Sequence, residues 1–267
     1  MQMLRSLVFN VAIYVWMAVL GLVYAPWALT RRAGARAACT RYAGDVRGML
    51  SALCCLETEV RGTPPTGEVL VAAKHQSFLD ILVIWHALPR PFFIMKALLK
   101  YAPVLGQYAL QVGCIPVERG KRAEAVRRML AEVRAGERKG GQLVIYPQGT
   151  RVAPGVVAPY KVGTFALYEQ LGQPCVPVAT NVGLFWPKRG LLRRPGRAVV
   201  EFLEPIPPGL GRAAFMAMLQ DRVEGGSNRL MEEAGFPVDL PPRAAVDPVG
   251  DAVQAATRTP TPGRPDA

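Results

Sequence analysis

The sequence predicts an α/β protein in which a mixed, largely parallel sheet is flanked by helices and preceded by an N-terminal membrane-associated helix pair. An uncharged apolar run covers residues 7–29, and after residue 67 short apolar runs alternate with helical patterns. Such alternation is typical of layered α/β folds. We therefore expect N-terminal helices over 1–60, a folded domain over 61–235 and a disordered, Pro- and Ala-rich tail over 236–267.

The N-terminal apolar run reads as a membrane helix. In helical form it would be roughly 34 Å long, which suffices for a hydrocarbon core of about 30 Å. A cleaved signal peptide is disfavoured because the run is too long and too aromatic. Arg5 precedes the run, whereas five arginines follow it within the next 18 residues. The positive-inside rule then predicts that the rest of the chain lies in the cytoplasm.

A second helix is expected between Ala35 and Leu56, where apolar residues recur at spacings of three and four. Arg36, Arg41 and Arg47 fall off this apolar stripe. The helix can pack against the first one or lie at the bilayer surface with its arginines toward anionic headgroups. A half-inserted hairpin and a true span both fit this pattern.

The turn cluster at 62–67 opens the folded domain. Strands are expected at Val69–Ala73, Phe92–Met95, Cys114–Val117, Leu143–Tyr146, Cys175–Thr180 and Ala198–Leu203, and helices at Phe78–Ala87, Lys121–Arg138 and Gly163–Leu171.

Charge and hydropathy narrow the class of partner. The net charge of +12 predicts an anionic partner, and the mean hydropathy of +0.17 favours a membrane surface or a phosphorylated substrate over nucleic acid. The sequence contains neither zinc-finger spacing nor a basic-aromatic RNA signature. The five cysteines form no Cys-x-x-Cys pair, so we expect small buried hydrophobes and no metal site.

The first candidate for chemistry is the segment His75-Gln-Ser-Phe-Leu-Asp80, which lies where a strand gives way to a helix. Ser77 is the expected N-cap. The first helical turn would bring the Asp80 carboxylate back to one imidazole nitrogen of His75. An oriented, neutral imidazole can remove a proton from a hydroxyl, which contributes roughly 10²–10⁴ in rate.

A second candidate, Tyr146-Pro-Gln-Gly-Thr-Arg151, directly follows a strand. Gly149 allows close backbone approach, and Thr150 and Arg151 supply donors suited to a phosphate. Lys96 and Arg119 follow other strands in the same way. Because ligands of open α/β sheets bind beyond the carboxyl ends of the strands, these basic side chains are expected to converge there.

Four ordered blocks resemble the glycerolipid acyltransferases, above all the bacterial members that acylate lysophosphatidate. The blocks are His75-x4-Asp80, Gly113-x-Ile-Pro-Val-x-Arg119, Tyr-Pro-Gln-Gly-Thr-Arg151 and Val176-Pro-Val-Ala179. The resemblance covers about residues 70–180 and extends to the N-terminal helices. The sequence departs from the family at Lys74, where Asn is usual, and at Tyr146 and Gln148, where Phe and Glu are usual.

The resemblance implies a glycerolipid acyltransferase-like fold and transfer of an acyl group to the free 2-hydroxyl of lysophosphatidate, giving phosphatidate. His75 would be the general base and Asp80 its orienting partner. The expected substrate-binding residues are Lys96, Arg119, Gln148, Gly149, Thr150 and Arg151. The acyl donor would be a thioester of acyl-carrier protein or coenzyme A, with no cofactor or metal. The expected location is the bacterial cytoplasmic membrane, with the catalytic domain on the cytoplasmic side.

Other functions are compatible with parts of the sequence. A relative that acylates another lyso-lipid, such as a lyso-ornithine lipid, would not need a phosphate site. A Ser77-His75-Asp80 lipid hydrolase and an inactive membrane-binding module come from other classes. The basic loop Lys188, Arg189, Arg193, Arg194 and Arg197 is either a solvated charge run or a contact for anionic lipids or an acidic carrier protein. His86 is expected to be structural.

Overall fold

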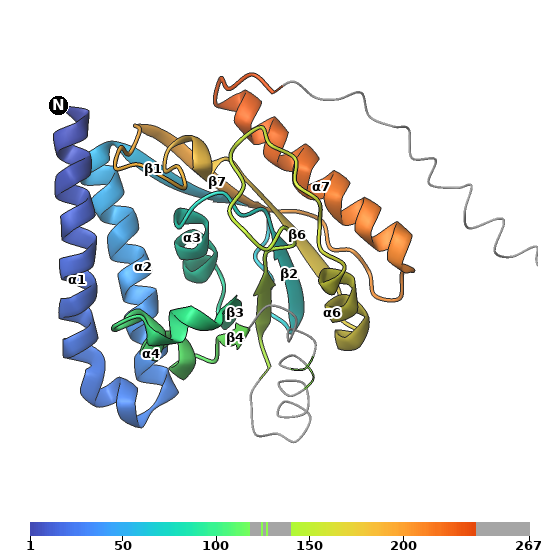
Figure 1. Cartoon of the computed structure of the whole chain (residues 1–267), viewed down its shortest axis with the longest axis horizontal. Coiled ribbons are helices and arrows are strands. Elements are labelled where there is room, and N and C mark those ends of the chain that lie inside the picture. Colours follow the sequence, from blue (N-terminus) through green and yellow to red (C-terminus); the bar gives the residue numbers. More distant parts are fainter. Residues whose placement is uncertain (118–123, 125–126, 128–139, 239–267) are drawn as a thin grey trace, which may run out of the picture. The chain divides into compact units, whose positions relative to one another are not determined.

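The computed structural model describes residues 1–117, 124, 127 and 140–238, and its architecture is a sheet covered by helices on both faces (Figure 1). Seven strands follow the order β1-β7-β6-β2-β5-β3-β4, and every pairing is parallel except that of β6 with β7. The strands are β1 (Leu56–Arg61), β2 (Val69–Ala73), β3 (Pro91–Lys96), β4 (Ile115–Val117), β5 (Gln142–Ile145), β6 (Cys175–Thr180) and β7 (Gly196–Phe202). The predicted mixed, largely parallel sheet is therefore confirmed.

The helices differ from the sequence-based expectation in three places. The described helices are α1 (Gln2–Thr30), α2 (Arg32–Cys54), α3 (Leu79–Ala87), α4 (Leu105–Gln111), α6 (Gly163–Leu171) and α7 (Arg212–Glu233), with 3-10 turns at Ala97–Tyr101 and Val182–Leu184. The second helix was expected to extend to Leu56, but α2 ends at Cys54 and Leu56 begins strand β1. α4 and α7 were not expected. The helix expected at Lys121–Arg138 and the tail from residue 239 lie outside the described residues.

The central strand β2 is buried on both faces, which its unbroken apolar sequence requires. Val71 and Ala73 belong to the core beneath α1, α2 and α3. Leu70 and Ala72 belong to the opposite core, which α6 and α7 cover. Successive side chains of a strand point to opposite faces, so β2 contributes residues to both cores. This packing on both faces holds the carboxyl end of β2, and the residues that follow it, in place.

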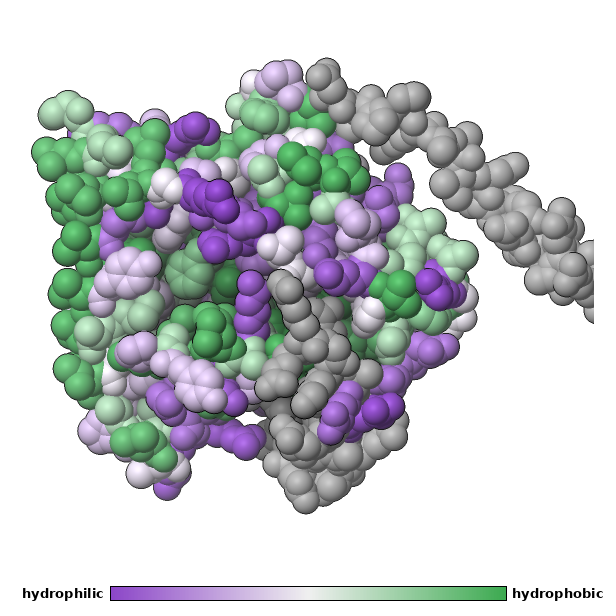
Figure 2. Space-filling model, viewed as in Figure 1, coloured by the Kyte–Doolittle hydropathy of each residue, from purple (hydrophilic) through white to green (hydrophobic). Residues whose placement is uncertain are grey.

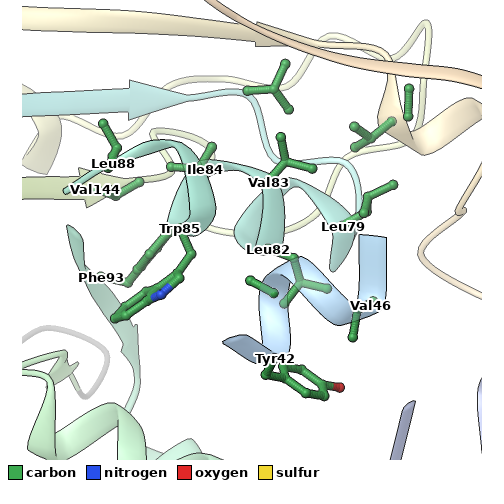
Figure 3. Packing of buried hydrophobic residues seen from close by; sticks show 14 of the residues in the cluster. Tyr42, Val46, Leu79, Leu82, Val83, Ile84, Trp85, Leu88, Phe93 and Val144 are labelled. Carbon is green, nitrogen blue, oxygen red and sulfur yellow. The ribbon is translucent and has the colours of Figure 1, made fainter. Parts of the chain in front are cut away.

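α3 lies between α2 and the sheet, and this position explains why most of its residues are apolar (Figure 3). Leu82 and Trp85 are among its buried residues, and Ile84 is fully buried. Tyr42 and Val46 of α2 belong to the same core. Burial of most of its side chains leaves the helix little freedom to shift, so its first turn is held at the end of β2.

α1 packs along α2 and exposes an apolar face on its other side (Figure 2, left edge). The helix is long and apolar enough to cross a membrane by length and composition. Its polar residues Gln2, Ser6 and Asn10 lie one turn apart and bond the loop at 191–193. Asn10 Nδ2 donates to Leu191 O at 2.8 Å, and Gln2 Nε2 donates to Arg193 O at 2.7 Å. Further along α1, Tyr108 of α4 donates to Gly21 O at 2.7 Å.

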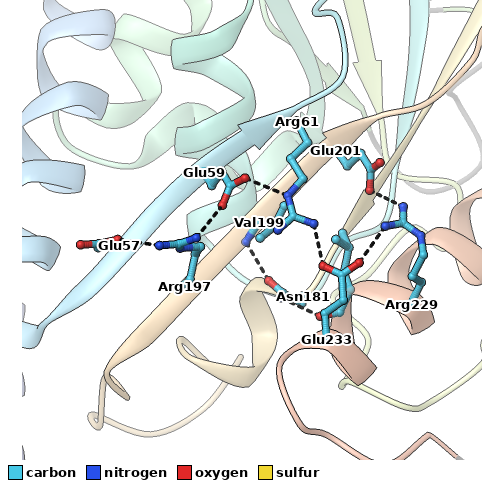
Figure 4. A network of polar contacts seen from close by, with 10 residues as sticks. Glu57, Glu59, Arg61, Asn181, Arg197, Val199, Glu201, Arg229 and Glu233 are labelled. Atoms are coloured by element: carbon cyan, nitrogen blue, oxygen red, sulfur yellow. Dashed lines mark hydrogen bonds and ion pairs between the residues drawn. The ribbon is translucent and has the colours of Figure 1, made fainter.

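α7 is tied to the edge of the sheet by charged contacts (Figure 4). Arg61 of β1 meets Glu233 at 2.6 Å, and Arg229 meets Glu201 of β7 at 2.5 Å. Close packing supports the same placement: a Cβ added to Gly226 would lie 2.8 Å from Ala179 Cβ of β6. α7 is therefore held against β6 and β7, next to the carboxyl end of β2.

Candidate active site

His75 and Asp80 meet as the sequence predicts. His75 follows the end of β2, and Asp80 lies in the first turn of α3, where the helix dipole favours a negative charge. The imidazole Nδ1 lies 3.0 Å from Asp80 Oδ1 and 3.2 Å from Oδ2. Asp80 is fully buried, whereas 14% of the His75 side chain is exposed. The ring is therefore anchored at Nδ1 and remains partly exposed to solvent.

Three further donors fix the Asp80 carboxylate. The backbone N–H groups of Gln76 and Ser77 donate to Oδ2 at 2.9 and 2.8 Å, and the Tyr146 hydroxyl donates to Oδ1 at 3.0 Å. A carboxylate with these donors is an acceptor toward His75 as well, so the network assigns the imidazole hydrogen to Nδ1. Nε2 then carries a lone pair, as a general base requires.

The Tyr146 ring also stacks on one face of the His75 imidazole. The two ring centroids lie 3.8 Å apart, and Phe93 of β3 stacks behind Tyr146 at 6.2 Å. The pKa of Tyr146 lies well above its usual range because of burial and the neighbouring Asp80 charge. The phenol thus remains a hydrogen-bond donor. The sequence alone placed Tyr146 in a phosphate-binding turn and did not predict this contact.

The turn after β5 is bonded to the backbone of His75. Val152 N donates to His75 O at 2.7 Å. Arg151 directly precedes Val152 in the chain, so this bond holds the Arg151 backbone next to that of His75. Gly149 has φ +70°, a conformation that favours glycine, and a Cβ there would lie 2.8 Å from Lys161 Cε. Thr150 and Lys161 are exposed, and Lys188 Nζ donates to Arg151 O at 2.9 Å. Lys161 thus adds a cation to this turn that the motifs did not indicate.

Lys96 is exposed at the carboxyl end of β3, at the same sheet edge as His75 and the turn after β5. Phe93, three residues earlier, belongs to the stack behind Tyr146. The strand expected before Arg119 is present as β4, but Arg119 itself lies outside the described residues. Lys96 is thus the last residue of β3, and Arg151 lies in the turn after the neighbouring strand β5. Their role at a phosphate stays a prediction.

A buried polar cluster of Lys74, Gln148, Tyr160 and Glu224 lies directly behind His75. The Lys74 ammonium is paired with Glu224 Oε2, and Gln148 Nε2 and Tyr160 OH donate to Glu224 Oε1 at 3.1 and 3.0 Å. Gln148 Oε1 accepts from His75 N at 3.4 Å. Gln148 is only 3% exposed, so its amide faces this cluster and not the open side of the site.

Two other residues take positions that limit their roles. Ser77 is fully buried and is not the N-cap: α3 begins at Leu79, whose N–H donates to Ser77 Oγ at 3.1 Å. His86 is exposed, and its Nδ1 lies 2.8 Å from Arg47 Nη1.

Arg193 is not a solvated member of the basic loop. It is 6% exposed and stacks on Trp186, with its Nη2 2.6 Å from Asn10 Oδ1, and burial lowers its pKa to about 10.

Comparison with known proteins points to one family. Residues 57–181 match the family model "Acyltransferase". The chain is 29% identical over 140 residues to 1-acyl-sn-glycerol-3-phosphate acyltransferase of Pseudomonas aeruginosa, covering 52% of this chain and 54% of that protein. It is 30% identical over 173 residues to 1-acyl-sn-glycerol-3-phosphate acyltransferase alpha of Bos taurus, covering 63% and 60%. The matches thus span about half to three fifths of these relatives.

The fold has a counterpart among solved structures. The crystal structure of 1-acyl-sn-glycerophosphate (LPA) acyltransferase from Thermotoga maritima aligns with a TM-score of 0.72 at 20% identity. The alignment covers 89% of this chain and 99% of that one. At this identity the likeness establishes the fold.

Proposed function

We propose that the chain transfers an acyl group from a thioester to the 2-hydroxyl of lysophosphatidate, giving phosphatidate. The match of residues 57–181 to the acyltransferase family model supports this proposal. The observation that carries the proposal is the arrangement of His75 and Asp80. The carboxylate is held by three donors besides the imidazole, which leaves Nε2 of His75 as the base at the open side of the site.

The proposed reaction needs only one proton carrier. His75 Nε2 removes the proton of the 2-hydroxyl as that oxygen attacks the thioester carbonyl. The tetrahedral adduct then expels the thiolate, and the imidazolium returns the proton to that sulfur. The products are the new ester and a free thiol, and Asp80 stabilises the imidazolium between the two steps. The fully buried Ser77 is not placed to attack an ester, which argues against the hydrolase alternative.

We propose that Lys96 and Arg151 bind the phosphate of the acceptor, with Arg119 completing the site. Lys96 ends β3 and Arg151 lies in the turn after β5, and these neighbouring parallel strands end on the side of the sheet where His75 lies. A guanidinium offers paired N–H donors to phosphate oxygens, and an ammonium adds a second positive charge. An acceptor without phosphate, such as a lyso-ornithine lipid, would not need these two side chains.

Membrane association is part of the same proposal, because both the acceptor and the product are lipids. α1 contacts the rest of the chain at several points along its length, through Gln2 at its N-terminal end and through Asn10 and Gly21 further along, and exposes apolar side chains on its other face. This arrangement favours a helix that lies half inserted along the bilayer over one that crosses it. The cytoplasmic face of a bacterial inner membrane remains the predicted location. Acyl-carrier protein and coenzyme A remain the two candidate carriers of the donor.

The proposal is tested with the full chain in membranes, using labelled lysophosphatidate and acyl thioesters of both carriers. We expect labelled phosphatidate from the wild type and at least a 10²-fold lower rate from His75→Ala. His86→Ala is the matched control, because it removes the other histidine from an exposed position and should leave the rate unchanged. Normal turnover by His75→Ala would refute the mechanism.

Parallel reactions separate the alternatives. Acylation of a lyso-ornithine lipid but not of lysophosphatidate would replace the proposed acceptor. Release of free fatty acid without ester formation would indicate a hydrolase. An intact, membrane-bound wild type that acylates neither acceptor would favour the inactive module.

A further inference from the structure

The cluster behind His75 contains a charged pair that the proposed mechanism does not use. Lys74 is 2% exposed and Glu224 is 9% exposed. Burial of a charge is unfavourable unless it is paired and hydrogen-bonded, and here both conditions are met. Glu224 accepts from Lys74, Gln148 and Tyr160, and Lys74 Nζ also donates to Val156 O at 3.4 Å. Lys74 and Glu224 therefore form a buried ion pair whose charges are hydrogen-bonded within the fold.

The pair connects α7 to both segments that form the site. Lys74 directly precedes His75 on the chain, and Gln148 belongs to the turn that carries Arg151. Gln148 contacts Glu224 through its Nε2 and the His75 backbone N–H through its Oε1. One amide thus bridges the carboxylate on α7 and the backbone from which the imidazole projects. Its orientation is set by Glu224, because a carboxylate accepts only and must face the NH₂ end.

We infer that Glu224 is a positioning residue for the proposed acyl transfer: together with Lys74, it orients Gln148 and so fixes the backbone of His75. This inference rests on the proposed function. Gln148 then holds the base in place instead of contacting the substrate. A small displacement of a catalytic group can reduce the rate by up to about 10²-fold, so the effect should fall on kcat.

Charge gives the inference a directional test. Glu224→Gln leaves the Lys74 ammonium next to His75 without its carboxylate, and a nearby positive charge disfavours the imidazolium. Lys74→Met leaves the Glu224 carboxylate uncompensated, which favours the imidazolium. The groups that contact His75, Asp80 and Tyr146, are unchanged in both variants, as are Arg151 and Lys161 on the adjoining turn. The two variants should therefore shift the acid limb of the pH–rate profile in opposite directions.

The experiment measures kcat, KM and the pH profile of both variants in the full chain. We expect kcat to fall about tenfold or more with KM nearly unchanged. The acid limb should move by about half a pH unit to lower pH in Glu224→Gln and to higher pH in Lys74→Met. Glu232→Gln, at an exposed position of the same helix, is the matched control. Shifts in the same direction, or no shift in either variant, would overturn the inference.

A second variant covers the case in which the single substitutions do not fold. Lys74→Met with Glu224→Gln removes both charges, so no buried ion is left unpaired. We expect this protein to fold, to keep the acid limb near its wild-type position and to retain a lowered kcat. A wild-type kcat in the double variant would show that the pair does not position His75.

A readout independent of acyl transfer separates this inference from the proposed function. Diethyl pyrocarbonate modifies neutral imidazole, and in a His86→Ala background His75 is the only imidazole, so the ultraviolet absorbance of the modified ring reports on His75 alone. The pH at which modification is half-maximal should move in the same opposite directions. If the wild type lacks acyl-transfer activity but these shifts occur, the proposed function fails and the charge coupling to His75 stands. If activity is present and the shifts are absent, the inference alone fails.

Discussion

The substitution Asp80→Asn tests the assignment of His75 as base without removing the imidazole. The carboxylate receives four hydrogen bonds, from His75 Nδ1, two backbone N–H groups and the Tyr146 hydroxyl. Asparagine has one acceptor oxygen and one NH₂ group. If its oxygen keeps the backbone donors of Gln76 and Ser77, its NH₂ must face His75 and Tyr146.

The consequence is a change of tautomer. An NH₂ group facing Nδ1 requires that nitrogen to accept, so the imidazole hydrogen moves to Nε2. The ring then presents a donor where the mechanism needs a base. General-base catalysis contributes roughly 10²–10⁴ in rate, so kcat should fall by about 10³-fold, or about 4 kcal/mol. Tyr146→Phe leaves the other three donors in place and should lower kcat only about tenfold.

Both variants would be assayed by acyl transfer to labelled lysophosphatidate at equal abundance in membranes. Asp221→Asn, at an exposed position of α7, controls for loss of a carboxylate elsewhere. KM should change little in either variant, because Asp80 is buried and does not reach the acceptor. A loss in Asp80→Asn no greater than in Tyr146→Phe would refute the tautomer argument.

Two further outcomes are expected. Arg151→Ala should weaken the apparent affinity for lysophosphatidate by roughly 10–150-fold, since loss of a charged hydrogen bond costs about 1.5–3 kcal/mol. Kinetics at saturating acyl donor measure this affinity, with Arg212→Ala as the control. An unchanged affinity would speak against a phosphate role for Arg151. The protein should stay with membranes through a high-salt wash and leave with detergent, because apolar insertion of α1 is not screened by salt. Immunoblots of the membrane and soluble fractions measure this, and release by salt alone would contradict insertion of α1.

Local sequence pattern predicted the strands whose faces are both buried, because an apolar run such as Val69–Ala73 carries that signal by itself. It failed where neighbouring signals merge. Leu53 and Leu56 continue one apolar stripe at helical spacing, yet Leu56 begins β1. Pairing with β7, 140 residues further on, decides its conformation. α7 was missed because Glu224, Ser227 and Asn228 occupy buried positions, which interrupts the apolar periodicity.

The same contrast separates the His75–Asp80 pair from the contacts of α1. His75 and Asp80 are five residues apart, so one strand-to-helix turn brings them together, and their spacing could be interpreted locally. The role of Asn10 could not, because its partners Leu191 and Arg193 lie about 180 residues away. Asn10 lies within the apolar run that the sequence assigns to a membrane helix, and in the structure it is a contact for a loop of the folded domain.

The departures at Lys74 and Gln148 become intelligible only when Glu224 is considered with them. Each is puzzling alone: a lysine beside the base, and an amide where the family usually has a carboxylate. Glu224, 150 residues from Lys74, supplies a carboxylate within 3.1 Å of the Gln148 amide. A glutamate at 148 would place two negative charges side by side in a buried cluster with a single lysine, and like charges so close raise each other's proton affinity. Glutamine at 148, lysine at 74 and glutamate at 224 therefore form one consistent set, in which the three side chains together balance the charge behind His75.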